Sequence, residues 1–285
     1  MTAPETRGGP SIEHLCALGR VSRAGFYRFG QARAPREAEA GLRDKIQAIA
    51  LENRFYGYRR VGPELWRRHG LKINHKHVLR LTREDNLLCL RTKPYVPRTT
   101  NSRHGFRITP NLVKDLIPSG LDQVWVADLT YIRLREDFVY LAVVLDAFSR
   151  KIVGWALDDH LQASLALEAL DMAPAARKPP PGLVHHSDRG VQYACADYSE
   201  RLEKTGVRAS MSRVANPYDN AKAESFMKTL KTEEVNGKAY TSIADARKNI
   251  GDFLENVYNK RRLHSALGYQ PPVEFEAELR QSETV

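Results

Sequence analysis

The spacing of apolar residues along the chain changes near residue 123. Before that point they recur every three or four positions, as Leu42, Ile46 and Ile49 do, which is typical of helices that pack one face on a core. After it, apolar runs such as 138–145 are typical of strands. The pattern therefore predicts a helical N-terminal part followed by an α/β part.

Local signals set the bounds of the N-terminal helices. Two short helices are expected between residues 11 and 29, and a longer one over 35–53. Pro63 predicts a helix over 63–69 that Gly70 ends, and Asn74 predicts the start of a third helix over 75–83. We divide this part into a short helical segment, 1–34, and a small all-α domain of the helix-turn-helix kind, 35–92.

The helix expected over 75–83 has a basic face. Lys76, Arg80 and Arg83 stand at i, i+4 and i+7 and so share one stripe. A recognition helix places basic side chains in a DNA groove in this way; a solvated basic face without a partner is the alternative. The proline-rich linker expected over 93–118 carries arginines that could follow a phosphate backbone: Arg98, Arg103 and Arg107.

From residue 119 the expected order of elements is β-β-β-α-β-α-β-α. The strands are expected over 124–134, 138–145, 152–157, 183–188 and 207–211, and the helices over 161–176, 195–204 and 221–234. This order makes a mixed sheet with helices on both faces, the ribonuclease H-like arrangement. We assign 119–235 to this core and 236–285 to a C-terminal helix and tail.

The charge of the chain is unevenly distributed. Residues 1–118 contain 23 Lys and Arg against 10 Asp and Glu, a net of +13, and the remaining 21 against 24 give −3. A basic first part joined to a mildly acidic remainder favours a polyanion-binding module beside a carboxylate-bearing site. No apolar run is long enough to cross a membrane and no signal peptide is evident, so we expect a cytoplasmic protein.

Cysteine and histidine chemistry has little support. Cys16, Cys89 and Cys195 are far apart in sequence and form no Cys-x-x-Cys pair, which argues against a disulfide framework. A histidine cluster precedes and enters the basic helix, but it lacks acidic or thiol partners at ligand spacing. Structural zinc is therefore not expected.

Three carboxylates lie in dense local patterns: Asp128, Asp188 and Glu224. The first two belong to strand-like runs and the third to a helix-like run, with 59 and 35 residues between them. Hard divalent cations prefer such oxygen ligands, and two ions about 4 Å apart can activate an attacking oxygen and stabilise a leaving one. The trio therefore predicts metal-dependent phosphoryl transfer. His186, near Asp188, is either a support for the site or a strand-end residue.

Several separated segments resemble one known family. They are Trp125-Val-Ala-Asp128-Leu-Thr-Tyr-Ile, Asp146-Ala-Phe-Ser-Arg150-Lys-Ile-Val-Gly-Trp155, His185-His-Ser-Asp188-Arg-Gly-Val-Gln-Tyr193, Asn216-Pro-Tyr-Asp-Asn220-Ala-Lys-Ala-Glu224, Tyr258-Asn-Lys-Arg-Arg262-Leu-His264 with the residues to Phe275, and Tyr56-Gly-Tyr-Arg59-Arg60-Val61. Together they resemble the orfB-type transposases of bacterial insertion sequences, within the retroviral integrase catalytic-core superfamily.

The resemblance implies a DDE transposase that cleaves the ends of an insertion sequence and joins the freed 3′-hydroxyl to another strand. Asp128, Asp188 and Glu224 match its ligands for two Mg²⁺ (or Mn²⁺) ions. Double-stranded DNA, both transposon ends and target, is the expected partner, bound by a homo-oligomer in the bacterial nucleoid. The residues expected to contact DNA are Lys228 and Lys231, which share a helix face with Glu224, and Lys76, Arg80, Arg83, Arg59 and Arg60.

The resemblance also implies a helix-turn-helix and leucine-zipper protein encoded in an upstream frame. This chain contains no heptad run, so we expect that part to be missing from it. Two other functions stay open from the sequence. One is a catalytically decayed DNA-binding regulator of transposition, and the other is a ribonuclease H-like nuclease with no joining activity.

Overall fold

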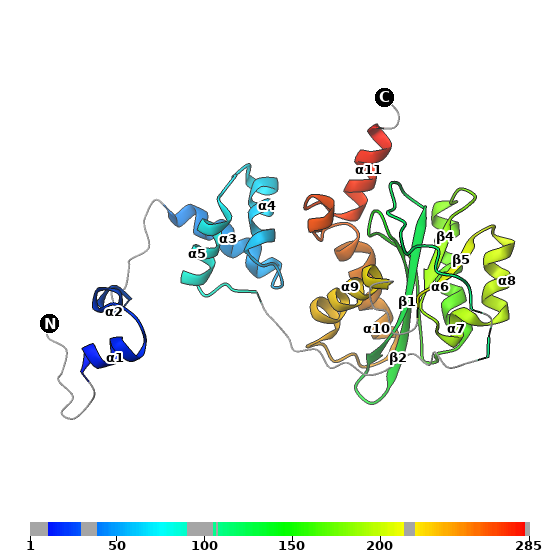
Figure 1. Ribbon diagram of the computed structural model, residues 1–285, viewed down its shortest axis with the longest axis horizontal. Helices are drawn as coiled ribbons and strands as arrows, with labels where there is room; N and C mark the ends of the chain where they lie inside the picture. Colours follow the sequence, from blue (N-terminus) through cyan, green and yellow to red (C-terminus); the bar gives the residue numbers. More distant parts are fainter. Residues whose placement is uncertain (1–10, 30–38, 90–104, 107, 214–219, 283–285) are drawn as a thin grey trace.

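The computed structural model describes residues 11–29, 39–89, 105–106, 108–213 and 220–282 (Figure 1). The expected arginines of the linker, Arg98, Arg103 and Arg107, and the expected helix start at Pro35 lie outside them. The described elements are α1 (Ile12–Leu18), α2 (Arg23–Phe29), α3 (Ala40–Glu52), α4 (Tyr58–His69), α5 (His75–Glu84), β1 (Val124–Arg133), β2 (Phe138–Asp146), β3 (Ile152–Asp158), α6 (Ala163–Arg177), β4 (Val184–Ser187), α7 (Val191–Ala194), α8 (Ala196–Lys204), β5 (Arg208–Met211), α9 (Ala221–Leu230), η3 (Lys231–Val235), α10 (Ile243–Asp252), η4 (Phe253–Tyr258), η5 (Ser265–Leu267) and α11 (Pro272–Ser282).

The sheet has the strand order β3-β2-β1-β4-β5. β1 pairs with β2, and β2 with β3, in antiparallel fashion, whereas β4 is parallel to both β1 and β5. Crossover helices supply the parallel connections, as a parallel pair requires. The predicted mixed, ribonuclease H-like α/β fold is thereby confirmed, with β1 and β4 as neighbours.

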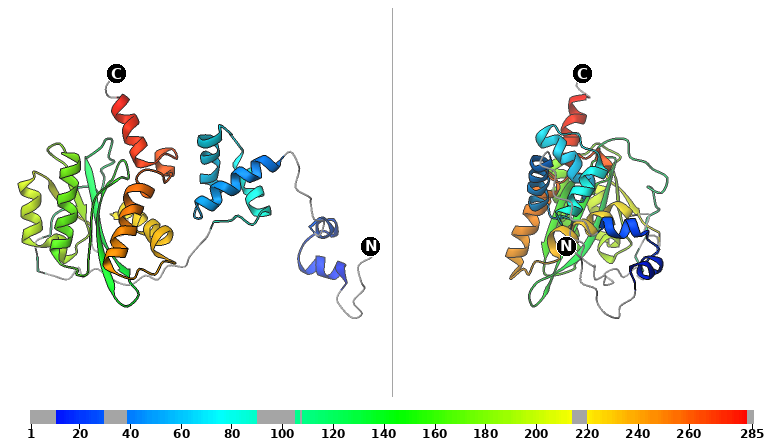
Figure 2. Two further views of the ribbon diagram at one scale, coloured as in Figure 1. Left: turned by 180° about the vertical axis from the view of Figure 1, so that it is seen from behind. Right: turned by 90° about the vertical axis from the view of Figure 1, so that its left-hand side faces the viewer.

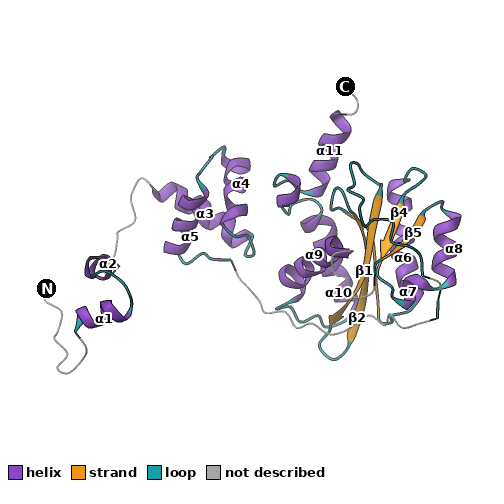
Figure 3. Ribbon diagram, viewed as in Figure 1, coloured by secondary structure: helices purple, strands orange, loops and turns teal. Residues whose placement is uncertain are grey.

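Helices cover both faces of the sheet (Figures 2 and 3). On one face, side chains of α9, α10 and η4 form a single apolar core with even-numbered residues of β1 such as Val126 and Ile132. On the other face, α6, α7 and α8 pack on odd-numbered residues such as Trp125. Helix α6 lies so close to β3 that a Cβ on Gly154 would come 2.1 Å from the Ala169 carbonyl oxygen, so this position requires glycine.

The three helices α3, α4 and α5 form the small N-terminal domain. Asn74 caps α5 by accepting from the Lys76 backbone N–H at 2.9 Å, and Gly70 ends α4 in the left-handed region at φ 67°, as the sequence predicts. The predicted start of α4 was wrong, because the helix begins at Tyr58 and contains Pro63 in its interior. The helix predicted over 221–234 is also split, since α9 continues as the π-helix η3 from Lys231.

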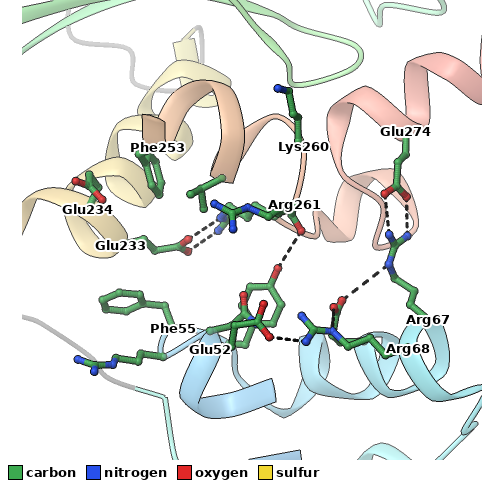
Figure 4. Close-up of a pocket in the computed structure, with 16 residues that line it drawn as sticks. Glu52, Phe55, Arg67, Arg68, Glu233, Glu234, Phe253, Lys260, Arg261 and Glu274 are labelled. Atoms are coloured by element: carbon green, nitrogen blue, oxygen red, sulfur yellow. Dashed lines mark hydrogen bonds and ion pairs between the residues drawn. The ribbon is translucent and has the colours of Figure 1, made fainter. Parts of the chain in front are cut away.

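A residue from the far end of the chain completes the core of this helical domain. Leu263 is fully buried among Ile46, Val61 and Leu65. Beside it, the Tyr56 hydroxyl accepts from the Leu263 N–H at 2.9 Å. Figure 4 shows this junction, where Arg67 also forms a two-pronged ion pair with Glu274 of α11 at 2.7 and 2.8 Å. The helical domain is therefore docked on the C-terminal segment.

Among the described residues, no helix is both long enough and apolar enough to span a membrane.

Candidate active site

Neighbouring strands bring Asp128 and Asp188 together. Val126 on β1 pairs with His186 on β4 in parallel register, so two residues further on Asp128 and Asp188 reach the same level of the sheet. The backbone fixes each carboxylate. Leu129 N–H donates to Asp128 Oδ1 at 2.9 Å, and Gly190 N–H donates to Asp188 Oδ1 at 2.8 Å. A Cβ on Gly190 would meet the same Asp188 oxygen at 2.9 Å, so the loop needs glycine there.

Glu224 enters the site on the first turn of α9. The side chain of Asn220, the residue before this helix, donates from Nδ2 to the Ala127 carbonyl at 3.1 Å. This bond ties the start of α9 to the strand position next to Asp128. The apolar face of α9, including Ala223 and Phe226, packs in the core and leaves Glu224 exposed. The helix thus brings the third carboxylate near enough to Asp128 for its charge to act on that group.

Electrostatics show that the three carboxylates share one site. Burial, together with the negative charges of Asp188 and Glu224, raises the pKa of Asp128 to about 7, while the Leu129 N–H and Lys231 oppose the rise. Burial also raises the pKa of Glu224. Like charges held together in a partly buried site favour a bound cation. An all-carboxylate donor set suits a hard divalent metal ion.

Two histidines before Asp188 support the strand from inside. His186 holds the Ser210 and Ser212 hydroxyls with its two ring nitrogens at 2.8 and 3.0 Å, so it links β4 to the end of β5. This placement makes His186 a support of the strand that carries Asp188. His185 meets the Tyr198 hydroxyl at 3.0 Å through Nε2, and burial lowers its pKa to about 3, so it is neutral.

The predicted basic residues fall into two groups. Lys231 lies at the carboxylates, with its ammonium 4.3 Å from the centre of the Tyr131 ring, and Lys228 is exposed one turn earlier. The others lie on α4 and α5 of the helical domain. Lys76, Arg83 and Arg59 are exposed there, with Arg59 against the Tyr58 ring.

Two of the predicted DNA contacts have partners within the protein. Arg80 pairs with Glu39 at 2.6 Å and with Glu84 at 2.9 Å. Arg60 lies over the Tyr56 ring, 3.8 Å from Glu233. Sequence reasoning missed Glu39, Glu233, Asn220 and Tyr131, because each acts through a partner distant in sequence, and it also missed Glu84, which pairs with Arg80 one turn earlier on the same helix.

Comparisons with known proteins show the family to which the chain belongs. Residues 119–217 and 205–272 match integrase core domain families, and residues 36–95 match an HTH-like domain family. The chain is 36% identical over 271 residues to an uncharacterized 31 kDa protein of insertion element IS600 from Shigella sonnei, covering 94% of this chain and 99% of that one. It is 35% identical over 272 residues to the transposase InsF of insertion sequence IS3A from Escherichia coli, covering 93% and 94%.

A solved structure is also similar. The HTLV-2 integrase catalytic core domain in complex with magnesium matches with 13% identity and a TM-score of 0.42, covering 54% of this chain and 95% of that one.

The fold and the carboxylate site define a transposase of the DDE type, a phosphoryl-transfer enzyme that acts on DNA. The chain belongs to the family of IS3-type insertion-sequence transposases. DNA binding and assembly into oligomers follow from that membership and from its HTH-like domain.

Proposed function

We propose that Asp128, Asp188 and Glu224 are the residues that would hold two Mg²⁺ (or Mn²⁺) ions. When bound, the ions lower the pKa of the attacking water or 3′-hydroxyl and neutralise charge on the leaving 3′-oxygen. The observation that carries this proposal is that Asp188 and Glu224 lie close enough to Asp128 for their charges to add to the effect of burial, which together raise the pKa of Asp128 to about 7.

The protein groups around the carboxylates hold them in place for this chemistry. The N–H groups of Leu129 and Gly190 each fix one oxygen, and Asn220 keeps α9 against β1. These contacts set the geometry in advance, so little has to rearrange when DNA arrives. Lys231 and Lys228, on the Glu224 side of the helix, are then placed to contact phosphates next to the reacting one.

We further propose that the helical domain contacts duplex DNA through Lys76, Arg83 and Arg59, which are exposed on α4 and α5. Arg80 and Arg60 form ion pairs with acidic residues of the protein itself. At this surface they therefore contribute positive potential more than direct contacts with DNA. A homo-oligomer would bring two element ends together, and an upstream-frame protein with its own helix-turn-helix would add to end recognition.

Two other functions compete with this one. A catalytically decayed regulator would bind element ends without cutting them, and a simple nuclease would cut without joining. The carboxylate trio and the backbone contacts that hold it favour an active enzyme, since a decayed site has no need of three repelling carboxylates.

The experiment uses purified protein, Mg²⁺ and labelled duplexes that carry the ends of the encoding insertion sequence. The parent is expected to nick the ends and to join them to a second duplex. Asp188→Asn keeps the shape of the side chain but removes its charge, so cleavage and joining should both fall by at least about 10³-fold while DNA binding persists.

The matched control is Asp197→Asn on α8, an exposed aspartate on the other face of the sheet, which should keep full activity. Strand transfer by Asp188→Asn at the parent's rate would refute the assignment. A parent that binds but never cuts would be the regulator, and one that cuts without joining would be the nuclease.

A further inference from the structure

A second charged cavity lies on a different face of α9 from Glu224. It has a volume of about 350 Å³ and is entered between α9, the β2–β3 turn, the segment after η4, and α4 of the helical domain. Positions 222, 225, 226 and 229 of α9 line it, whereas Glu224, Lys228 and Lys231 follow another stripe of the same helix. The cavity is therefore separate from the carboxylate site.

Four cations from distant parts of the sequence line this cavity: Arg60, Arg150, Lys222 and Arg262. Each of the four lies in a different one of the segments that carry the family resemblance. The hydroxyl side chains of Ser225, Thr229 and Ser265 are also in the wall, and no carboxylate of the described residues lines it. The lining is thus rich in hydrogen-bond donors and positive charge.

Two of the four cations lack a direct ion-pair partner among the described residues. The side chains of Arg150 and Lys222 are half-buried, and within the described part of the chain neither makes a hydrogen bond or an ion pair. Burial lowers the pKa of both groups, and the Arg150 charge lowers that of Lys222 further. Holding two unpaired cations away from water, beside each other, costs free energy that an anion would recover. Arg150 also has a positive φ of 62°, which few non-glycine residues adopt.

Nearby acids do not neutralise the cavity. Glu233 forms two hydrogen bonds with Arg262, at 2.8 and 2.7 Å, and also faces Arg60. The charge of Asp146 raises the pKa of both Arg150 and Lys222, and the oxygens of Asp146 are held by backbone N–H groups. When Arg60, Arg150, Lys222 and Arg262 are counted against Glu233 and Asp146, these described residues leave a net charge of +2 at the cavity. His264, 8% exposed, adds a buried Nε2 that has no hydrogen-bond partner in the described structure.

We propose that this cavity binds a backbone phosphate of a DNA strand, away from the phosphate that reacts. Arg guanidinium and Lys ammonium groups are the usual partners of phosphate, and a phosphodiester would supply the missing negative charge. Arg150 and Lys222 also line an adjoining cavity of about 420 Å³ whose other walls include Phe148 and Phe275, which gives the neighbouring sugar an apolar surface. Because Arg60 belongs to the helical domain, a phosphate bound here would contact both the helical domain and the catalytic domain.

The test measures DNA binding by the full chain in EDTA, so that it does not depend on the metal reaction proposed above. The variant is Arg150→Gln with Lys222→Gln. The control is Lys204→Gln with Arg208→Gln, which removes the same two charges from exposed positions at the other side of the sheet. The probe is a fluorescent 30-base-pair duplex titrated at several NaCl concentrations, with thermal unfolding measured in parallel.

The cavity variant should bind the duplex at least about tenfold more weakly at low salt, as expected for one charged hydrogen-bonding contact, and its salt slope should fall by about one. Its Tm should stay equal to that of the parent or rise, because two repelling cations are gone. The control should show neither change in binding. Equal losses in variant and control, or unchanged binding in both, would overturn the proposal.

Two further outcomes would also overturn it. A fall in the Tm of the cavity variant would mean that Arg150 and Lys222 hold the fold together. If inorganic phosphate raises the Tm of the parent but not of the variant while duplex binding is the same in both, the cavity is a site for free phosphate and not for DNA.

Discussion

The ammonium group of Lys231 lies 4.3 Å from the centre of the Tyr131 ring, on the strand that carries Asp128. This contact places a half-buried cation beside the carboxylates proposed to hold the metal ions, where it lowers the pKa of Asp128 against the effects of burial. The sequence alone predicted that Lys231 and Lys228 would act as equals on one helix face. In the structure Lys231 is half-buried against the Tyr131 ring, whereas Lys228 is exposed.

Lys231→Ala should therefore have two effects and Lys228→Ala one. Loss of the cation–π contact should lower the stability of the metal-free protein by about 0.5–1 kcal/mol, whereas the exposed Lys228 should be silent in unfolding experiments. Both variants should need more DNA for half-maximal cleavage and should be more sensitive to NaCl. Urea unfolding in EDTA and cleavage titrations measure these effects. Equal stability of the two variants would argue against the ring contact.

Asp128→Asn should stabilise the metal-free protein while it abolishes activity. The raised pKa of Asp128, about 7, means that its charged form is disfavoured in the fold, so stability falls as pH rises from the unfolded pKa of about 4 to 7. At pH 8 the neutral asparagine should raise the Tm in EDTA by at least about 2 °C. The Mg²⁺-dependent rise in Tm should disappear. If the Tm of Asp128→Asn in EDTA is lower than that of the parent, the charged Asp128 carboxylate does not destabilise the fold.

Buried neutral His185 should make the protein sensitive to acid. Its pKa is lowered to about 3 by burial, against about 6.5 when unfolded, so the unfolded chain binds the proton first. Stability is fully present above about pH 6.5 and is lost as pH falls from there toward 3, with a slope of up to about 1.4 kcal/mol per pH unit.

Urea unfolding of the parent and His185→Gln between pH 7.5 and 5.0 measures this slope. Asp128 acts in the opposite direction, so the difference between the two proteins is the diagnostic quantity. The variant should show the smaller loss on acidification, and parallel curves would contradict the prediction.

The docking of the helical domain should depend more on Tyr56 than on the visible ion pair. Tyr56→Phe leaves the buried Leu263 N–H without an acceptor, which costs about 1–3 kcal/mol. Arg67→Ala breaks an exposed pair with Glu274, which is worth about 0–1 kcal/mol. Thermal unfolding of both variants compares the two contacts. A larger loss in Arg67→Ala would mean that the docking is electrostatic.

Much of the fold follows from local rules. Period-2 and continuous apolar runs gave the strands that carry or precede Asp128 and Asp188, and the helix caps at Asn74 and Gly70 needed only their own neighbours. The start of α4 did not follow, because Pro63 was interpreted as a first-turn residue although it lies inside the helix. The π-helix at Lys231 has no sequence signal, since its hydrogen bonds depend on packing.

The parts of the site that could not be predicted depend on contacts between distant residues. The three carboxylates could be predicted from the local sequence around them. The roles of two other residues could not, because Asn220 acts through the Ala127 carbonyl and Lys231 through the Tyr131 ring. Arg60 reads as a DNA contact until Glu233, far along the chain, is placed next to it. Charge patterns on a sequence do not show which cations are already paired.

The position of Leu263 also sets an order of events during synthesis. The hydroxyl of Tyr56 meets the Leu263 N–H across 207 residues, and Leu263 fills the interior of α3, α4 and α5. The N-terminal domain is therefore synthesised early, but its hydrophobic core stays incomplete until almost the whole chain has been made. A polypeptide released before that residue would contain the helices that cover the sheet, but it would lack α11 and the side chain that completes the core of the helical domain. Such a fragment would be a poor competitor for element ends, so incomplete translation would not interfere with the full-length enzyme.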